Sequence, residues 1–341
     1  IIIVAEGAMD RHGEKITSER VKNALEERLG EAARVTMLGH VQRGGMPSAY
    51  DRWMPTLLGY TATLELINSD GDAYIIGTRR NRLVKLPLMK AVQDTRAVKT
   101  YTAEGDYEAA IGARGTSYGE MVKTFDVLSA PVPPNGHAKP KGRIALVHVG
   151  GLAPGMNTAA RTAVRLGIDR GYEMVGIKGG LPGLVDGKLV PLSWWDVESW
   201  SSTGGAALGT HRRIPSIAEF YAMGRTIEDA KIDGIMIIGG LNGFEAALKM
   251  KEERQRFSAF KIPIICVPAS IDNNLPLTEL SIGTDTALNT NVRVLNQIKQ
   301  SASASRRCFV TETMGRNSGY LALMSAIASG AEQVYLAETG I

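Results

Sequence analysis

Cysteine is scarce in this chain. Its 341 residues include only Cys266 and Cys308, which excludes the disulfide framework typical of small secreted domains. Both cysteines fall inside short apolar runs of the kind that form β-strands, where a free thiol behaves as a small hydrophobic group. We therefore expect two reduced cysteines in apolar surroundings and a cytoplasmic location.

Long apolar runs and a strong charge of one sign are also missing. No apolar run approaches the roughly 18 residues of a membrane span, and the first residues lack the pattern of a signal peptide, so we expect no contact with a membrane. The formal net charge is +4 and the basic residues are scattered, which argues against nucleic acid as a partner. The densest basic run, residues 78–85, is expected to be a solvated turn or strand edge.

The composition is that of a globular protein, with 44% hydrophobic and 22% charged residues. In the first stretch, the spacing of apolar residues predicts strands over 1–5, 34–38 and 73–76 and helices over 18–29, 55–67 and 86–98. The pattern weakens over residues 102–121, and a short helix is predicted up to about residue 128. Residues 131–140 are rich in proline, which is typical of a linker.

Apolar runs also stand at both ends of the chain. Residues 1–4 and 334–338 are each predicted as part of a strand, and neither end has a polar lead-in. Because strands of a parallel sheet seldom form a natural terminus, we interpret the chain as an internal piece of a longer protein.

The second stretch alternates strand and helix with regular spacing. The predicted strands are 143–149, 173–177, 234–238, 262–267 and 308–311, and the predicted helices are 156–170, 217–230, 244–256, 286–300 and 318–328. Short buried strands separated by helical crossovers indicate an α/β fold with doubly wound parallel sheets and helices on both faces. In such sheets ligands bind beyond the carboxyl ends of the strands.

Glycine-rich loops follow the predicted strands. Gly150 to Asn157 opens a helix and offers bare backbone amides to an anion. It fits neither the Walker phosphate loop nor the Gly-x-Gly-x-x-Gly dinucleotide spacing, which argues against a nicotinamide oxidoreductase. Comparable loops follow at 204–213, 239–243, 268–274 and 312–316.

The order and spacing of these loops resemble the second half of the duplicated, eukaryotic-type ATP-dependent 6-phosphofructokinases, over residues 143–341. The first stretch resembles the end of the first half of the same enzymes, since Val4–Ala8 and Leu38–Arg52 match family hallmarks and Arg34 lies at the matching offset upstream. The resemblance implies two homologous halves, each partly present. Residues 1–96 would end the first, catalytic half, 97–140 would form an interdomain linker, and 141–341 would begin the second, regulatory half.

For the whole protein the resemblance implies phosphorylation of fructose 6-phosphate to fructose 1,6-bisphosphate in glycolysis. ATP and Mg²⁺ are the implied cofactors, and their loops in the catalytic half would lie outside this sequence. The implied fructose 6-phosphate ligands are Glu6, Arg34, His40, Val41, Gln42 and Arg43. Guanidinium groups suit a phosphate, and a carboxylate suits sugar hydroxyls. Arg34 is implied to reach a neighbouring subunit, which predicts a homo- or hetero-oligomer, a tetramer or larger.

The second half departs from the catalytic pattern of the family. Leu152, Leu241 and Asn274 stand where active halves carry carboxylates for magnesium, so we expect no metal site and no catalysis here, although Asp272 occupies the position of the family base. Retention of phosphate ligands without metal ligands is what an effector site requires. The resemblance implies a site for fructose 2,6-bisphosphate built from Arg212, Ser270, Ile271, Asp272, Asn273, Asn274, Arg307, Met314, Gly315 and Arg316.

Two other functions stay open from the sequence. A pyrophosphate-dependent phosphofructokinase would share the fold and the sugar site, because the loop that selects the phosphoryl donor belongs to the first half and is not present. A non-catalytic sensor would bind a sugar phosphate in both halves. Acidic residues in the first-half loops would indicate an enzyme, and apolar residues there would indicate a sensor.

Overall fold

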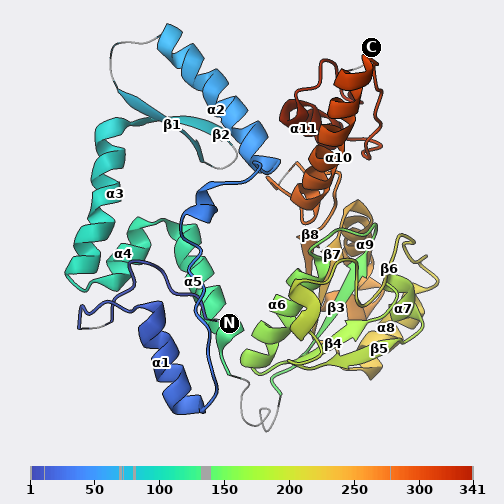
Figure 1. Ribbon diagram of the computed structural model, residues 1–341. Helices are drawn as coiled ribbons and strands as arrows, with labels where there is room; N and C mark the ends of the chain where they lie inside the picture. Colours follow the sequence, from blue (N-terminus) through green and yellow to red (C-terminus); the bar gives the residue numbers. More distant parts are fainter. Residues whose placement is uncertain are drawn as a thin grey trace. The chain divides into compact units, whose positions relative to one another are not determined.

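The computed structural model describes residues 2–339, apart from 11, 69, 70, 72, 80, 81, 132–139 and 277. The chain divides into two compact units, shown with the sequence colours in Figure 1. The first unit comprises Ile1–Pro47, Glu65–Gly77 and Leu83–Val122, and the second comprises Ser48–Leu64, Thr78–Arg82 and Lys123–Ile341. Across the described ranges, no helix has the length and apolar character needed to cross a bilayer.

A six-stranded sheet forms the centre of the second unit. Its main path runs β5 (Leu189–Leu192), β4 (Glu173–Ile177), β3 (Arg143–Val149), β7 (Gly234–Gly239) and β8 (Ile264–Pro268), and the short β6 (Thr210–His211) also pairs with β3. All neighbours are parallel except β4 and β5, which are antiparallel. The sheet is therefore mixed, with an antiparallel edge strand that the sequence pattern did not predict.

Helices cover both faces of this sheet, as Figure 1 shows. They are α6 (Met156–Asp169), α7 (Leu181–Val185), α8 (Phe220–Asp229) and α9 (Leu241–Glu252). The side chains of Ala145, Val147 and Val149 pack with those of α7, α8 and α9, whereas Leu146 between them packs with Val164 of α6. This alternation follows from the two-residue period of a strand.

Two further helices, α10 (Thr284–Ser305) and α11 (Tyr320–Ser329), pack against each other in the second unit. The backbone N–H of Ala49 donates to Oδ1 of Asn289 at 3.0 Å, and Arg52 donates to Oδ1 of Asn296 at 3.1 Å. The start of α2 (Tyr50–Ile67) therefore belongs to this packing. The described residues also contain four short 3₁₀ turns: Gly39–Arg43 (η1), Glu198–Ser201 (η2), Glu253–Gln255 (η3) and Ser258–Lys261 (η4).

The first unit is mainly helical. It contains α1 (Ser18–Leu29), α3 (Leu88–Ala103), α4 (Tyr107–Ala113) and the first half of α5 (Thr116–Ser129). The chain between α2 and α3 forms a two-stranded sheet of β1 (Tyr74–Arg79) and β2 (Arg82–Pro87), most of which belongs to this unit. No residue of α1, α2 or α3 is buried. A doubly wound parallel sheet is thus found only in the second unit among the described residues.

Four predicted strands are wrong. Residues 2–5, 34–38, 308–311 and 334–338 have no strand conformation in the described chain, and Ile1 lies outside the described residues. A strand needs a neighbouring strand to satisfy its backbone groups, and none lies beside these segments in the described residues. Their apolar side chains are correspondingly open, with Met37 83% and Val310 98% exposed.

Residues 97–140, the expected linker, are largely helical in the described chain, and their role as a linker stays a prediction. The last turns of α3 and the helices α4 and α5 occupy residues 97–129, and residues 132–139 lie outside the described residues. Asp106 caps α4 by accepting from the N–H of Ala109 at 3.0 Å, and glycines at 105 and 115 have positive φ. Only α4 lies between these glycines, and its seven residues are too few to display a clear apolar period. The helix expected up to about residue 128 is α5.

Two local predictions need correction as well. The helix expected from Pro55 begins at Tyr50, with Pro55 inside it, because proline marks a first turn only on average. Cys308 is exposed, not packed in a strand, whereas Cys266 is half-buried in β8. Burial raises the pKa of the Cys266 thiol.

Candidate functional site

Four loops of the second unit begin side by side at one edge of the sheet. Val149 lies opposite both Gly239 and His211, and Gly239 lies opposite Pro268. The strand order changes direction at β3, because β4 lies on one side of it and β7 on the other. Ligands of open α/β sheets bind at this switch point, beyond the carboxyl ends of the strands.

Glycine allows these loops to approach closely. A Cβ atom on Gly239 would lie 2.1 Å from the carbonyl oxygen of Val149, and one on Gly240 would lie 3.4 Å from Cβ of Ser270. A Cβ atom on Gly151 would lie 3.3 Å from Nη2 of Arg212. These glycines therefore allow the loops to pack closely. Because Gly151 has no side chain, it also leaves the backbone next to Arg212 free of side-chain atoms.

Arg212 and Arg213 are adjacent, and only the side chain of Arg212 is free of polar contacts within the described residues. Its exposed guanidinium group makes no hydrogen bond or ion pair with any described residue. The strand before it is fixed, since the Gly150 N–H donates to the His211 carbonyl at 3.0 Å and the Thr210 hydroxyl donates to the Gly150 carbonyl at 3.0 Å. Arg212 therefore has a fixed backbone and an available cationic side chain.

Arg213, in contrast, is occupied by Glu219 at the start of α8. Glu219 also accepts from the Ser216 N–H at 2.8 Å and from the Ser216 hydroxyl at 3.0 Å. These donors, the Ser216 N–H first and Arg213 next, lower the pKa of the Glu219 carboxyl to about 2. Glu219 thus holds Ser216 and Arg213 in the turn that precedes α8, which explains why only one of the two arginines is free.

The loop after β8 is held in a defined conformation by its own side chains. Asn273 has a positive φ of 46°, and its amide group donates to the Glu279 carbonyl at 3.1 Å and accepts from the Ser281 N–H at 2.8 Å. The Ser270 carbonyl accepts from Thr284 at 3.0 Å. Within the described residues, the carboxylate of Asp272 has no hydrogen-bond partner, so it is available to a ligand.

The segment around Gly315 is joined to this loop. The hydroxyl of Ser318 donates to the carbonyl of Asp272 at 2.8 Å, and Gly315 turns toward Ser318 with a φ of 127°. A Cβ atom on Gly315 would lie 2.2 Å from the Ser318 carbonyl oxygen, so glycine is required. The exposed Met314 and Arg316 flank this turn and therefore belong to the same part of the unit as Asp272.

Arg307 lies away from these loops. The Ser270 loop is attached to the first residue of α10 through Thr284, whereas Arg307 follows the last residue of that helix. A helix of 22 residues is about 33 Å long. Arg307 is exposed, and it is too distant from Ser270 to contact the same small ligand within one chain.

Magnesium does not fit this edge of the sheet. Leu152 and Leu241 are 59% and 50% exposed at the positions that follow the two glycine loops, and an apolar side chain offers no oxygen to a hard cation. Among the described residues, no group of three or more His, Cys, Asp or Glu side chains could hold a metal ion. Arg212 and the backbone amides are hydrogen-bond donors of the kind that a phosphate accepts, and the expectation that this half does not catalyse phosphoryl transfer stays a prediction.

Asn157 was not singled out from the sequence, although it organises the loops. Its buried side chain donates to the carbonyls of Thr203 and Gly204 at 2.9 and 3.1 Å and accepts from the Ala207 N–H at 2.7 Å. It thereby joins the start of α6 to the loop that leads into β6. The available signal was an amide side chain in the first turn of an amphipathic helix, on the side that faces the sheet.

His148 is a second residue that the sequence analysis missed. Its side chain is fully buried in β3, and neither ring nitrogen makes a hydrogen bond of normal geometry with a described residue. Burial lowers the pKa of this imidazole to about 4, against a smaller opposing effect of the Met156 backbone. A neutral histidine thus lies directly below the glycine loop.

This histidine predicts sensitivity to acid. Its pKa is about 4 when folded and 6.5 when unfolded, so the unfolded state takes up the proton first as the pH falls through that range. The free energy of opening of β3, measured by amide hydrogen exchange, should decrease by about 2 kcal/mol between pH 7 and pH 5. His148→Leu should abolish this decrease, and His12→Leu, at an exposed histidine, should retain it. An equal decrease in both variants would contradict the assignment.

The predicted ligands of the first unit are all exposed. Glu6 lies in a turn closed by the Ala8 N–H and the Ala5 carbonyl at 3.0 Å, Arg34 lies in an irregular segment after α1, and His40–Arg43 lie in η1. In the described residues, no hydrogen bond or ion pair connects these three places. The geometry leaves their side chains accessible, and their binding role stays a prediction.

Known proteins resemble this chain over nearly its whole length. The sequence model of the family described as Phosphofructokinase matches residues 1–66 and 143–341. The chain is 41% identical over 349 residues to the ATP-dependent 6-phosphofructokinase of Dictyostelium discoideum, and covers 41% of that protein. It is 40% identical over 343 residues to the platelet-type enzyme of Homo sapiens, and covers 43% of it. Either alignment includes at least 99% of this chain.

Solved structures give the same relationship. Phosphofructokinase from Saccharomyces cerevisiae matches 98% of this chain with a TM-score of 0.90 and 36% identity, over 46% of its own chain. Pichia pastoris phosphofructokinase in the T-state matches 96% with a TM-score of 0.89 and 34% identity, over 37% of its own chain. The chain thus spans less than half the length of these relatives.

Proposed function

This chain belongs to the phosphofructokinase family, and we propose that it forms part of a longer enzyme that phosphorylates fructose 6-phosphate with ATP. The names of its relatives support ATP as the donor, and their length supports a second, unseen portion. We further propose a cytoplasmic enzyme that assembles as a tetramer or larger oligomer, with magnesium and ATP held in the catalytic half.

The division into two halves is part of the proposal. Residues 1–96 end the catalytic half and supply fructose 6-phosphate ligands from Glu6, Arg34 and His40–Arg43. Residues 141–341 begin the regulatory half, and residues 97–140 connect the two. The start of the second half is supported by the family match, which ends at residue 66 and resumes at residue 143.

The regulatory half, we propose, binds fructose 2,6-bisphosphate at the edge of its sheet. The observation that carries this proposal is the unpaired Arg212 guanidinium group beside Gly151, where the metal-binding carboxylates are replaced by Leu152 and Leu241. Ser270–Asn274 and Met314–Arg316 provide the further ligands on this chain. Phosphate groups can bind to these donors without being transferred, which is the property of an effector site.

Calorimetric titration tests the effector site directly. The polypeptide should bind fructose 2,6-bisphosphate, and Arg212→Ala should weaken that binding, whereas Arg213→Ala serves as the matched control because Arg213 is occupied by Glu219. Equal effects of the two substitutions would contradict the site. Binding without any activity in the full-length protein, with either ATP or pyrophosphate, would favour the sugar-phosphate sensor, and activity with pyrophosphate alone would favour that donor.

The 341-residue polypeptide by itself should not phosphorylate fructose 6-phosphate. Leu152, Leu241 and Asn274 cannot replace the carboxylates that hold magnesium on the phosphates. A coupled assay with ATP and Mg²⁺ should therefore show no turnover above the background without protein, at the same concentration that gives effector binding. Magnesium-dependent turnover that is removed by Asp272→Asn would show that this half is catalytic.

A further inference from the structure

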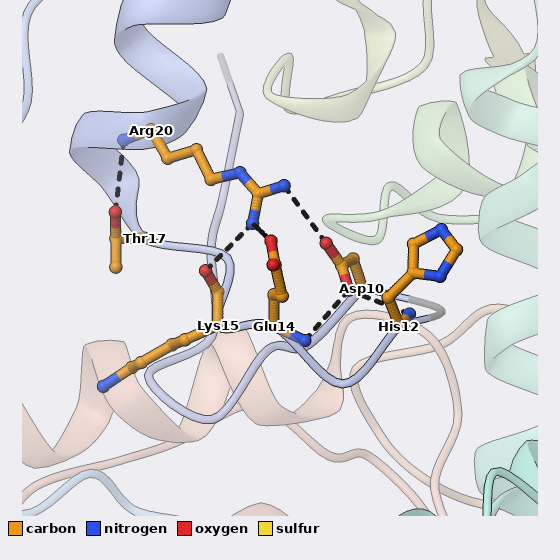
Figure 2. A network of polar contacts seen from close by, with 6 residues as sticks. All are labelled: Asp10, His12, Glu14, Lys15, Thr17 and Arg20. Atoms are coloured by element: carbon orange, nitrogen blue, oxygen red, sulfur yellow. Dashed lines mark hydrogen bonds and ion pairs between the residues drawn. The ribbon is translucent and has the colours of Figure 1, made fainter.

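Arg20, at the start of α1, holds together the loop that follows Glu6 (Figure 2). Its Nη2 donates to Oδ2 of Asp10 at 3.1 Å, and its Nη1 lies 3.3 Å from Oε2 of Glu14 and 3.4 Å from the Lys15 carbonyl. Figure 2 shows the guanidinium group between the two carboxylates. One side chain therefore connects three points of this loop to the helix.

Asp10 organises the same loop from within. Its Oδ1 accepts from the N–H groups of His12 and Glu14, both at 2.9 Å, and these contacts are drawn in Figure 2. The backbone N–H of Glu14 is the largest cause of the lowered pKa of the Asp10 carboxyl, to which Arg20 also contributes. The ion pair with Arg20 thus acts on a carboxylate that is already fixed by the backbone.

The loop is continuous with the turn that carries Glu6. The carbonyl of Ala8 accepts from the Ile16 N–H at 2.9 Å, and the N–H of Ala8 closes the turn over Glu6 by donating to Ala5 at 3.0 Å. Thr17, next to Ile16, caps α1 by accepting from the Arg20 N–H at 3.1 Å. The position of Glu6 is therefore connected to α1 by two routes, the backbone pairing at Ala8 and the Arg20 guanidinium group.

A comparable contact fixes the other end of α1. Oε1 of Glu26 accepts from the Ala33 N–H at 3.0 Å, immediately before Arg34, and Gly30 ends the helix with a φ of 69°. Lys22 lies 3.8 Å from the Glu26 carboxylate and keeps a positive charge beside it. The segment that carries Arg34 is thus held to the last turns of the same helix.

We propose that α1 positions both Glu6 and Arg34, through Arg20 at its start and Glu26 at its end. This inference rests on the proposed function, because Glu6 and Arg34 are ligands only if the site binds fructose 6-phosphate. Arg20 and Glu26 do not touch the substrate. They determine where the two ligand-bearing segments lie before the substrate arrives, so that binding does not have to order them.

Steady-state kinetics of the full-length enzyme test the positioning role. Arg20→Ala and Glu26→Ala should each raise the KM for fructose 6-phosphate by about 3- to 10-fold and leave the KM for ATP unchanged. Arg28→Ala and Glu27→Ala are matched controls, since both residues are exposed on α1 and make no polar side-chain contact within the described residues. These controls should leave both KM values unchanged.

Double substitutions separate positioning from general stability. If Arg20 acts through Glu6, Arg20→Ala should have no further effect on the KM once Glu6 is alanine, and Glu26→Ala should have none once Arg34 is alanine. Additive effects would overturn the positioning role alone. The same conclusion would follow if Glu6→Ala and Arg34→Ala raise the KM for fructose 6-phosphate while the Arg20 and Glu26 variants leave it unchanged. Unchanged KM values in Glu6→Ala and Arg34→Ala would instead overturn the proposed substrate site.

Discussion

Arg307→Ala in the full-length enzyme is expected to raise the concentration of fructose 2,6-bisphosphate needed for half-maximal activation by roughly 10- to 150-fold. This range corresponds to loss of a charge-assisted hydrogen bond to a phosphate, about 1.5–3 kcal/mol. The exposed guanidinium group has no partner among the described residues, so its removal breaks no internal contact. A titration of activity against the effector measures the shift.

The neighbouring Arg306 supplies the matched control. It ends α10 with a left-handed φ of 51°, a conformation that asparagine tolerates well. Arg306→Asn therefore removes an adjacent charge without disturbing the helix end, and it should leave the activation curve in place. An unshifted curve for Arg307→Ala would make Arg307 a surface charge, and a collapsed maximal velocity would make this half catalytic.

Mixed oligomers can show whether Arg307 acts on another subunit. The length of α10 keeps Arg307 about 33 Å from the Ser270 loop of its own chain. If it serves a neighbouring site, oligomers assembled from Arg212→Ala and Arg307→Ala chains contain some sites with both arginines intact. These mixtures should regain part of the high-affinity activation that neither variant has alone. No recovery would show that Arg212 and Arg307 do not combine in one site across subunits.

Arg34→Ala is expected to raise the KM for fructose 6-phosphate by a similar factor, roughly 10- to 150-fold, with the KM for ATP nearly unchanged. Arg34 is exposed after α1, and its planar group suits a phosphate in two-point contact. Arg34→Lys keeps the charge but loses the fork geometry, so its KM should be intermediate. Equal increases for both substrates would mean that Arg34 supports the structure and not the sugar site.

The second unit was largely predictable because its sequence periods coincide with its packing. The strand over 143–149 and the helix near 156–170 were both found, since Val147 and Leu146 are buried on opposite faces of the sheet. The antiparallel β5 was missed because it is four residues long and contains Pro191. Such a segment has too few residues to show alternation.

The first unit was less predictable because the apolar residues that suggested strands are not buried in the described chain. The runs at 2–5 and 34–38 have the composition of strands but no pairing partner, and the seven-residue α4 lacks a clear period. Site residues followed a similar rule. Sequence motifs predicted Arg212 and Asp272 as site residues, whereas Asn157 and the Arg20–Asp10 pair were recognised only from contacts between loops.

The length of α10 has a consequence for how regulation depends on protein concentration. If the effector is held by Arg212 of one subunit and Arg307 of another, a dissociated chain has only part of each site. Dilution below the dissociation constant of the oligomer would then abolish the response to the effector without altering any residue. The abundance of the enzyme would itself become a regulatory variable, because subunit encounter would precede effector binding.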